Sequence, residues 1–281
     1  MNWLIIDEII INALKEDVSD EDITTSSISN ELSRSSVDLI AKEVGVLAGL
    51  EVFKRVFTIL GDVEIEFYKK DGDAVNCGDL IGVLTGNTRK LLTGERTALN
   101  FLRIMSGIAT LTNKYIQGLL GTNTKLLDTR KTTPNLRILE KYSVKIGGGT
   151  NHRFNLSDGV LIKDNHISAA GGIKNAVEMV RNNVSFVRKI EVEVENLEMV
   201  KEALVAMADI IMLDNMSLTD MRHAVELINH RALTEASGNI ELDSIRNICD
   251  IAKTGVDYIS VGALTHAYKS LDLSMKNLRN I

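Results

Sequence analysis

Cysteine is scarce in this sequence, with only Cys77 and Cys249 among 281 residues. The two lie far apart and form no CxxC pair, which argues against a disulfide framework and against a structural zinc site. A signal peptide is not expected, because Asp7 and Glu8 interrupt the apolar N-terminus and no basic segment precedes it. No apolar run approaches the ~18 residues that a membrane span needs. We therefore expect a cytoplasmic protein with no membrane partner.

Several familiar catalytic motifs are also missing. The glycine cluster at residues 147–149 has neither the GxxxxGKS/T spacing of a P-loop nor the GxGxxG of a dinucleotide-binding fold. No HExxH or paired Cys/His spacing indicates a protein-bound transition metal, and no GxSxG elbow indicates a serine hydrolase. The net charge of −6 works against nucleic acid as the main partner, because duplex binding draws on a basic face.

Positive charge is nevertheless concentrated in residues 128–166, which hold seven lysines and arginines against four acidic residues. A local cationic island in an acidic protein favours a small anionic ligand. An alternative applies to Arg137, Lys141 and Lys145, which follow helical spacing and are equally well explained as a solvated helix face.

From residue 125 onward, short apolar runs alternate with amphipathic helical segments, which indicates parallel βαβ units. Strands are expected at 125–127, 159–162, 190–194, 210–213, 233–236 and 258–261, and helices at 197–206 and 218–229. A doubly wound sheet and an α/β barrel with flanking helices both fit this alternation. Polar or small residues follow each run, and barrel enzymes draw their catalytic groups from the ends of many strands, so the pattern favours the barrel.

The first hundred residues mix helical and strand-like patterns without this alternation, which predicts an N-terminal α+β sandwich domain. Residues 63–67 alternate as a half-buried strand should, and a long helix is predicted from Gly94. We expect the sandwich domain over residues 1–105 and the barrel over residues 106–265. The C-terminal segment 266–281 is a candidate to pack back on the first domain.

Cationic side chains are expected at or between the strand ends, where ligands bind in barrels: Arg130, Lys131, His152, Arg153 and Lys163. Gathering like charges is unfavourable unless an anion offsets the repulsion, so a polyanionic ligand explains them better than folding does. Arginine suits planar carboxylates through its fork, while lysine suits phosphates as a point charge. His152 and His166 are candidates for acid–base chemistry.

Two carboxylates end other predicted strands. Glu193 and Asp214 would offer hard oxygen atoms to hydroxyl groups or to a magnesium-bound phosphate. Glu191, Glu193 and Glu195 alternate with valine and so point to the same face, and only one or two of them can reach the strand end. An ion pair with a lysine or arginine inside the barrel is the alternative for each glutamate.

The last two predicted strands are followed by glycine turns. Their backbone N–H groups are candidates to hold a phosphate, although plain tight turns fit equally well. The residues concerned are Ser237, Gly238, Asn239, Gly262 and Ala263.

Eight strings in this sequence resemble quinolinate phosphoribosyltransferase, and the likeness runs from about Glu16 to the C-terminus. They lie at residues 94–100 (GERTALN), 106–110 (SGIAT), 128–134 (DTRKTTP), 147–153 (GGGTNHR), 161–166 (LIKDNH), 209–215 (DIIMLDN), 235–238 (EASG) and 260–265 (SVGALT). The resemblance implies a homodimer whose subunits combine a sandwich domain with an incomplete α/β barrel. It also implies a reaction of quinolinate with phosphoribosyl pyrophosphate and Mg²⁺, which gives nicotinate mononucleotide, pyrophosphate and CO₂ in NAD biosynthesis.

The family's site residues are carried over through these strings. The resemblance implies that the quinolinate carboxylates are held by Arg130, His152, Arg153 and Lys163, together with Arg96 from the partner subunit. It implies that Lys131 and Lys163 contact the phosphoribosyl donor, and that Glu193 and Asp214 contact the ribose hydroxyls of the donor or the metal. It also implies that the 5′-phosphate of the donor is held by Ser237, Gly238 and Gly262. Glu195 is the alternative to Glu193. Three other functions stay open: a nicotinate-specific relative, a molybdenum-associated relative, and a non-catalytic anion-binding protein.

Overall fold

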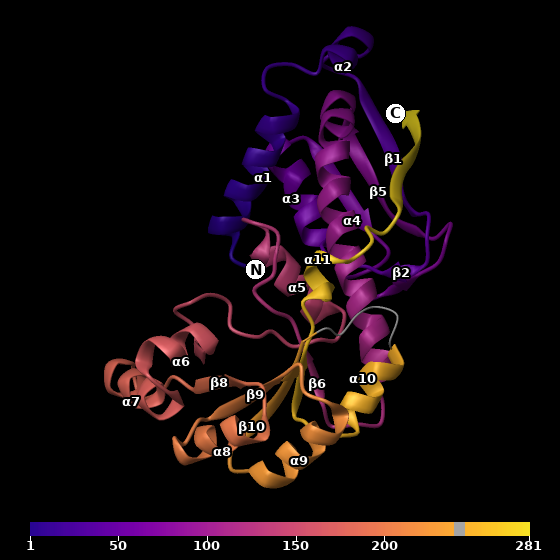
Figure 1. The fold of residues 1–281 in the computed structure, drawn as a ribbon. Helices are drawn as coiled ribbons and strands as arrows, with labels where there is room; N and C mark the ends of the chain where they lie inside the picture. Colours follow the sequence, from indigo (N-terminus) through magenta and orange to yellow (C-terminus); the bar gives the residue numbers. More distant parts are fainter. Residues whose placement is uncertain (239–244) are drawn as a thin grey trace. The chain divides into compact units, whose positions relative to one another are not determined.

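The computed structural model describes residues 1–238 and 245–281, and these residues form two compact units (Figure 1). Unit 1 comprises Met1–Asn113, Thr133–Gly148 and Ala267–Ile281, and unit 2 comprises Lys114–Thr132 and Gly149–His266. Both units are therefore built from separate stretches of chain.

Unit 1 is an antiparallel α+β unit whose main sheet has the strand order β12-β1-β5-β3, and a smaller sheet pairs β2 with β4. Its elements are α1 (Trp3–Asp17), α2 (Ile23–Ile28), β1 (Arg34–Ala41), β2 (Gly45–Val46), α3 (Leu50–Leu60), β3 (Val63–Phe67), β4 (Ala74–Val75), β5 (Leu80–Asn87), α4 (Thr88–Gly118, continuing into unit 2), α5 (Arg137–Ile146) and β12 (Leu273–Asn280). Strand β12 pairs antiparallel with β1, so the C-terminal residues complete the sheet of this unit.

The core of unit 1 follows from the spacing of apolar residues along α3. Val52, Phe53, Val56 and Phe57 are fully buried and fall on one side of the helix, as the i, i+1, i+4, i+5 spacing requires. Gly94 lets α4 pass close by, because a Cβ at this position would lie 2.8 Å from the Phe57 ring. The helical packing of this unit therefore depends on a glycine where two helices meet.

Helix α4 begins at Thr88, six residues before the predicted start at Gly94. The side chain of Asn87 accepts a hydrogen bond from the Lys90 N–H at 3.2 Å, which is the bond that an N-cap residue makes to the first turn. The prediction missed this cap and was wrong about where the helix begins.

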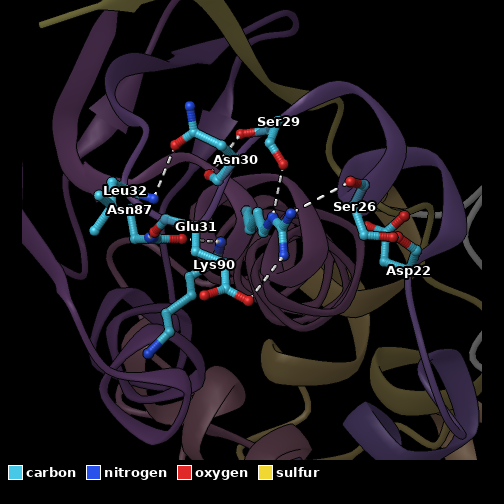
Figure 2. A network of polar contacts seen from close by, with 9 residues as sticks. Asp22, Ser26, Ser29, Asn30, Glu31, Leu32, Asn87 and Lys90 are labelled. Carbon is cyan, nitrogen blue, oxygen red and sulfur yellow. Dashed lines mark hydrogen bonds and ion pairs between the residues drawn. The ribbon is translucent and has the colours of Figure 1, made fainter.

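The segment between α2 and β1 is fastened to the start of α4 by a polar network (Figure 2). The Arg89 guanidinium donates to the Ser29 carbonyl at 2.8 Å and to the Ser26 carbonyl at 3.3 Å, and it lies 3.7 Å from the Glu31 carboxylate. The Asn87 amide donates to the Glu31 carbonyl at 2.7 Å. The bonds to the Ser29 and Glu31 carbonyls take the place of regular secondary structure in this segment, while Ser26 is a residue of α2.

Helix α5 corrects a second expectation. Lys141 is only 2% exposed, and Leu139, Ser143 and Val144 of the same helix are buried as well. Lys145 is exposed and Arg137 is half-buried. The solvated-face alternative for these three residues is therefore wrong for Lys141.

Unit 2 is an open α/β barrel. Its elements are β6 (Lys125–Leu127), β7 (Val160–Ile162), α6 (Asp164–Ala170), α7 (Ile173–Asn183), β8 (Ile190–Val194), α8 (Leu197–Val205), β9 (Ile210–Asp214), α9 (Leu218–Ile228), β10 (Leu233–Ser237), α10 (Ile245–Ala252), β11 (Tyr258–Ser260) and α11 (Ala263–His266). Six strands pair in the order β6-β11-β10-β9-β8-β7, every pair is parallel, and helices α7, α8 and α10 pack on the strands. Within the described residues β6 and β7 do not pair with each other, so the barrel is incomplete.

The predicted fold class is confirmed in both parts: an antiparallel α+β unit and a parallel, incomplete α/β barrel. All six predicted strands of the barrel are present, with ends displaced by one residue at most. Among the described residues, no helix is both long and apolar enough to cross a membrane.

Candidate active site

The carboxyl ends of the parallel strands gather the predicted catalytic side chains at one edge of the sheet. The strand register places Asp214 beside Ser237 and Val194 beside Leu213. Lys163 directly follows β7, which pairs with β8. Lys163, Glu193, Asp214 and Ser237 therefore belong to the same edge, where α/β barrels place their chemistry.

Lys163 and Glu193 form an ion pair at this edge. The Lys163 Nζ lies 2.7 Å from the Glu193 Oε2, and the two side chains are 45% and 15% exposed. Glu195 lies beyond the end of β8 and is exposed. Of the two glutamates that the sequence could not distinguish, Glu193 is the one that contacts another predicted site residue.

His166 contacts the same strand end in a different way. Its Nδ1 accepts a hydrogen bond from the Lys163 backbone N–H at 3.0 Å, at the start of α6. The ring thereby satisfies one of the N–H groups that a helix start leaves without a partner. This contact gives His166 a structural task beside Lys163.

Asp214 is held by Asn215, a residue that the sequence reasoning did not single out. The Asn215 amide donates to the Asp214 carboxylate at 2.8 Å, and its backbone N–H donates to the Ser237 carbonyl at 3.0 Å. Gly238 has a φ of 101°, and a Cβ there would lie 2.2 Å from the Asn215 Oδ1. Only glycine fits this turn. Asn239, also predicted for the site, lies outside the described residues.

Lys131 is positioned by the chain that follows β11. The Thr265 hydroxyl donates to the Lys131 carbonyl at 2.7 Å, and the Lys131 N–H donates to the Thr129 hydroxyl at 3.0 Å. A Cβ on Gly262 would lie 3.0 Å from the Lys131 Cδ. The glycine turn, with Ala263 as the first residue of α11, therefore lies directly against the lysine side chain.

Arg130 and Arg153 form the arginine part of the site. Burial, together with the nearby charge of Arg130, lowers the pKa of Arg153, while Glu191 acts in the opposite direction. The Arg153 Nη1 donates to the Gly159 carbonyl at 2.9 Å. Two guanidinium groups that repel each other are the arrangement that a bound carboxylate would stabilise.

Asp128 anchors the loop that carries Arg153. It is fully buried and accepts hydrogen bonds from the Asn151 amide at 2.6 Å and from the His152 N–H at 2.8 Å. Thr150 pairs in parallel with Leu127, so this loop runs beside β6. A polar residue directly after an apolar strand was the signal for Asp128, but the sequence does not show what it binds.

His152 points into the barrel. Its Nε2 lies 3.2 Å from the Glu191 Oε2 and 3.5 Å from the Glu235 Oε2, and both glutamate side chains are almost completely buried. A cavity of about 450 Å³ adjoins this cluster and is lined by 16 residues, among them His152, Arg153, Arg188, Glu191, Glu235 and Tyr258. Of the predicted site residues, only His152 and Arg153 line this particular cavity.

Arg96 is the one predicted site residue that belongs to unit 1. It is exposed on α4, next to Glu95, whose pKa is raised by burial. Its exposure leaves the guanidinium accessible to a ligand or to another chain.

Two family models match this chain, one over each part of the sequence. They are quinolinate phosphoribosyl transferase, N-terminal domain, over residues 22–106, and quinolinate phosphoribosyl transferase, C-terminal domain, over residues 108–276.

Individual relatives match nearly the whole chain. It is 44% identical over 276 residues to the probable nicotinate-nucleotide pyrophosphorylase (carboxylating) of Bacillus subtilis, covering 98% of this chain and 94% of that protein. It is 40% identical to quinolinate phosphoribosyltransferase (decarboxylating) 2b, mitochondrial, of Nicotiana tabacum, covering 96% and 81%. The crystal structure of NadC from Streptococcus pyogenes is 48% identical and superposes with a TM-score of 0.96, covering 100% of this chain and 99% of that one.

Proposed function

The chain belongs to the quinolinate phosphoribosyl transferase family, and from this membership we propose that it transfers the phosphoribosyl group of phosphoribosyl pyrophosphate to quinolinate and decarboxylates the product. The products are nicotinate mononucleotide, pyrophosphate and CO₂, as a step of NAD biosynthesis. The observation that carries the proposal is the Lys163–Glu193 ion pair at the strand ends, at the same edge as Asp214. A site that combines cations with carboxylates suits an anionic substrate whose ribose becomes positively charged.

In the transfer step, the lone pair of the quinolinate ring nitrogen forms a bond to C1′ of the ribose. The bond from C1′ to the pyrophosphate oxygen breaks, and pyrophosphate leaves with its electron pair. Positive charge develops on the ribose, and we assign its stabilisation to the carboxylates of Glu193 and Asp214. Lys131 and Lys163 carry the charge that offsets the leaving pyrophosphate.

In the decarboxylation step, the quaternised ring nitrogen draws electrons from the adjacent ring carbon. The bond from that carbon to its carboxylate breaks and CO₂ leaves. The electron pair stays on the ring carbon, which then takes up a proton. Arg130 and Arg153 are suited to hold the two carboxylates of quinolinate, because a guanidinium can form two parallel hydrogen bonds to each carboxylate.

Mg²⁺ fits the residues at the strand ends. The half-buried carboxylates of Glu193 and Asp214 offer the hard oxygen ligands that Mg²⁺ prefers, usually together with substrate phosphates. The ion would neutralise charge on the pyrophosphate group of the donor. We assign the 5′-phosphate to the turns at Ser237–Gly238 and Gly262–Ala263, because backbone N–H groups at glycine turns bind phosphate.

The proposal extends to assembly and location. We propose a homodimer in which Arg96, exposed on its own subunit, contributes to the quinolinate site of the partner. The two free thiols, Cys77 and Cys249, suit a reducing cytosol, which we propose as the location.

The test is to incubate the purified protein with quinolinate, phosphoribosyl pyrophosphate and Mg²⁺, and to measure nicotinate mononucleotide, pyrophosphate and CO₂. We expect the three products in equal amounts. A parallel reaction with nicotinate, which has one carboxylate, should give no turnover. Turnover with nicotinate and none with quinolinate would overturn the proposed acceptor.

A non-catalytic anion-binding protein is the competing function from another class. Such a protein would need the cations but neither Glu193 nor Asp214. Binding of phosphoribosyl pyrophosphate without any product in the presence of quinolinate and Mg²⁺ would favour it.

A further inference from the structure

Two buried glutamates lie one layer below the strand ends of the barrel. Glu191 is two residues before Glu193 on β8, and Glu235 is two residues before Ser237 on β10. Because side chains alternate along a strand, each points to the same face as the residue above it. Their side chains are 3% and 2% exposed, so both carboxyl groups lie within the barrel.

The ring of His152 lies against both carboxyl groups. Its Nε2 is 3.2 Å from the Glu191 Oε2 and 3.5 Å from the Glu235 Oε2. Negative charge at this distance favours the imidazolium form of the ring. In that form Nδ1 also carries a proton and gives up the hydrogen bond that it accepts from the Arg153 backbone N–H at 2.7 Å. A buried pair of opposite charges outweighs the loss of one neutral hydrogen bond, so the ring holds an acidic proton on Nε2.

The cluster holds a second acidic proton, on Glu235. Burial, followed by the charge of Glu191, raises the pKa of Glu235 to about 8, while the charge of His152 acts in the opposite direction. Glu235 is therefore mostly protonated at neutral pH, and Glu191 carries the negative charge that pairs with the ring. The Glu235 Oε1 has no hydrogen-bond partner among the described residues, which leaves this atom available to hold the proton.

A cavity connects the two glutamates with the surface. Its volume is about 450 Å³, and its lining includes Glu191 and Glu235 together with the exposed residues Arg188 and Lys189, which directly precede β8. Among the described residues, those at the carboxyl ends of β8, β9 and β10 do not line it. Solvent can thus reach the buried carboxyl groups from the amino ends of the strands, away from the proposed substrate site.

A metal site is the alternative for this cluster. One ligand atom each from His152, Glu191 and Glu235 lie within 4.8 Å of one another. However, a metal ion needs the lone pair of the His152 Nε2, and an imidazolium ring has none to offer. The charge state that the carboxyl groups favour therefore suits a proton better than a metal ion.

We propose that His152 and Glu235 form a proton relay for the decarboxylation step, in which His152 gives the proton that the ring carbon of the substrate takes up and Glu235 replaces it. The inference rests on the proposed function, in which His152 contacts quinolinate. A hydrogen-bond donor to the carboxylate that leaves is next to the carbon that loses it. Glu191 is a positioning residue, because its charge keeps the ring protonated.

The relay has three transfers. The bond from Nε2 to its proton breaks and its electron pair stays on the nitrogen, while the proton bonds to the electron pair that CO₂ leaves on the ring carbon. The Glu235 carboxyl group then gives its proton to Nε2. Finally, the Glu235 carboxylate takes up a proton from solvent through the cavity, so the cluster returns to its starting charge.

The test measures the two chemical steps separately in a single turnover. Quinolinate labelled with ¹⁴C in the carboxylate next to the ring nitrogen is mixed with phosphoribosyl pyrophosphate, Mg²⁺ and excess protein, and pyrophosphate and labelled CO₂ are followed over time. With the unaltered protein, CO₂ should appear together with pyrophosphate. With Glu235→Gln, which has no acidic proton, pyrophosphate should form within about 2-fold of the unaltered rate. CO₂ should form about 10- to 100-fold more slowly, because CO₂ loss stays reversible until the ring carbon takes up a proton.

The comparison does not depend on how much of the variant is folded, because both products come from the same protein molecules. Glu191→Gln should also delay CO₂ relative to pyrophosphate, since it removes the charge that keeps His152 protonated. Glu235→Asp keeps an acidic group and should recover part of the rate of CO₂ formation. An unchanged rate of CO₂ formation in Glu235→Gln, or equal slowing of both products, would overturn the relay.

The control is Glu198→Gln, an exposed residue of α8 whose carboxylate contacts Lys201. It should change the rate of neither product. If the unaltered protein forms neither pyrophosphate nor CO₂ from quinolinate, the proposed function fails. If the unaltered protein forms both and Glu235→Gln does not separate them, the relay fails and the proposed function stands.

Discussion

Glu193 and Glu191 are two residues apart on β8 and face the same side of the sheet, yet their surroundings differ. Glu193 is 15% exposed and contacts the half-exposed Lys163. Glu191 is 3% exposed and contacts His152 close to the carboxyl group of Glu235. The upper layer joins groups of opposite charge that a ligand can reach, and the lower layer joins buried groups that contact one another, although the Oε1 atoms of Glu191 and Glu235 have no hydrogen-bond partner among the described residues.

This difference shows how the depth of a residue within the barrel determines its use. Charges at the strand ends remain partly hydrated, so a substrate can exchange for water without leaving a buried charge unpaired. One layer below, an unpaired charge would be costly, and burial raises the pKa of Glu235, which favours its neutral form and reduces that cost. Function is therefore expected to respond most to the upper layer, and stability and loop geometry to the lower one.

The largest expected effect is on the upper layer. Glu193→Gln keeps the size of the side chain but removes the charge that stabilises the ribose, so kcat should fall by about 100- to 1,000-fold. Steady-state rates with both substrates saturating would measure it. The matched variant is Glu195→Gln, which alters an exposed residue beyond the end of β8 and should change kcat by less than about 3-fold. The opposite order would assign the catalytic role to Glu195.

Arg153 should give the next largest effect. Arg153→Lys keeps a positive charge but loses the fork that pairs with a carboxylate and the bond to the Gly159 carbonyl. We expect the KM for quinolinate to rise by about 10- to 50-fold, equivalent to the loss of one or two charge-assisted hydrogen bonds. The KM for phosphoribosyl pyrophosphate is the internal reference. An unchanged KM for quinolinate would remove Arg153 from the acceptor site.

Glu235 should affect stability in a way that depends on pH. Burial raises its folded pKa to about 8, from an ordinary value of 4.5. A raised folded pKa gives stability that is complete below pH 4.5 and is lost as the pH rises toward 8, because the unfolded state releases the proton first. Glu235→Gln stays neutral, so it should gain on the unaltered protein by an amount on the order of 1–3 kcal/mol between pH 5 and pH 8.

Urea unfolding at pH 5, 6, 7 and 8 would measure this difference. Glu198→Gln, which changes an exposed carboxylate, should follow the unaltered protein at every pH. Parallel curves for Glu235→Gln and the unaltered protein would show that Glu235 is ionised in the folded state, which would contradict its raised pKa.

The strands, the order of the barrel units and the upper layer could be predicted from the sequence. Short apolar runs that end in polar residues are a local signal, and the parallel topology brings their ends together. Glu193 and Asp214 were found for this reason. The family resemblance added the substrate and the division of residues among its parts.

The lower layer could not be predicted in the same way. The alternation of Glu191 with valine gives its face but not its depth, and Glu235 appears in the sequence as one more residue of a strand. Their approach to His152 depends on the curvature of the sheet and on the path of a loop far away in the chain. Lys141 was misjudged for a related reason, because helical spacing does not show which face of a helix is buried.

The smallest expected effect lies outside the barrel, in the polar network of unit 1 (Figure 2). Arg89→Met keeps the aliphatic stem but removes the hydrogen bonds to the Ser26 and Ser29 carbonyls. These bonds are partly exposed, so water can replace part of them, and the free energy of unfolding should fall by about 1 kcal/mol. Urea unfolding would measure it, with Lys54→Met, an exposed lysine of α3, as the control.

The kcat and both KM values should stay unchanged, because the network satisfies backbone groups and contacts none of the proposed site residues. A selective rise in one KM with Arg89→Met would show that a polar network in unit 1 also supports the site. The two layers of the barrel would then not be the only parts of the described residues that determine substrate binding.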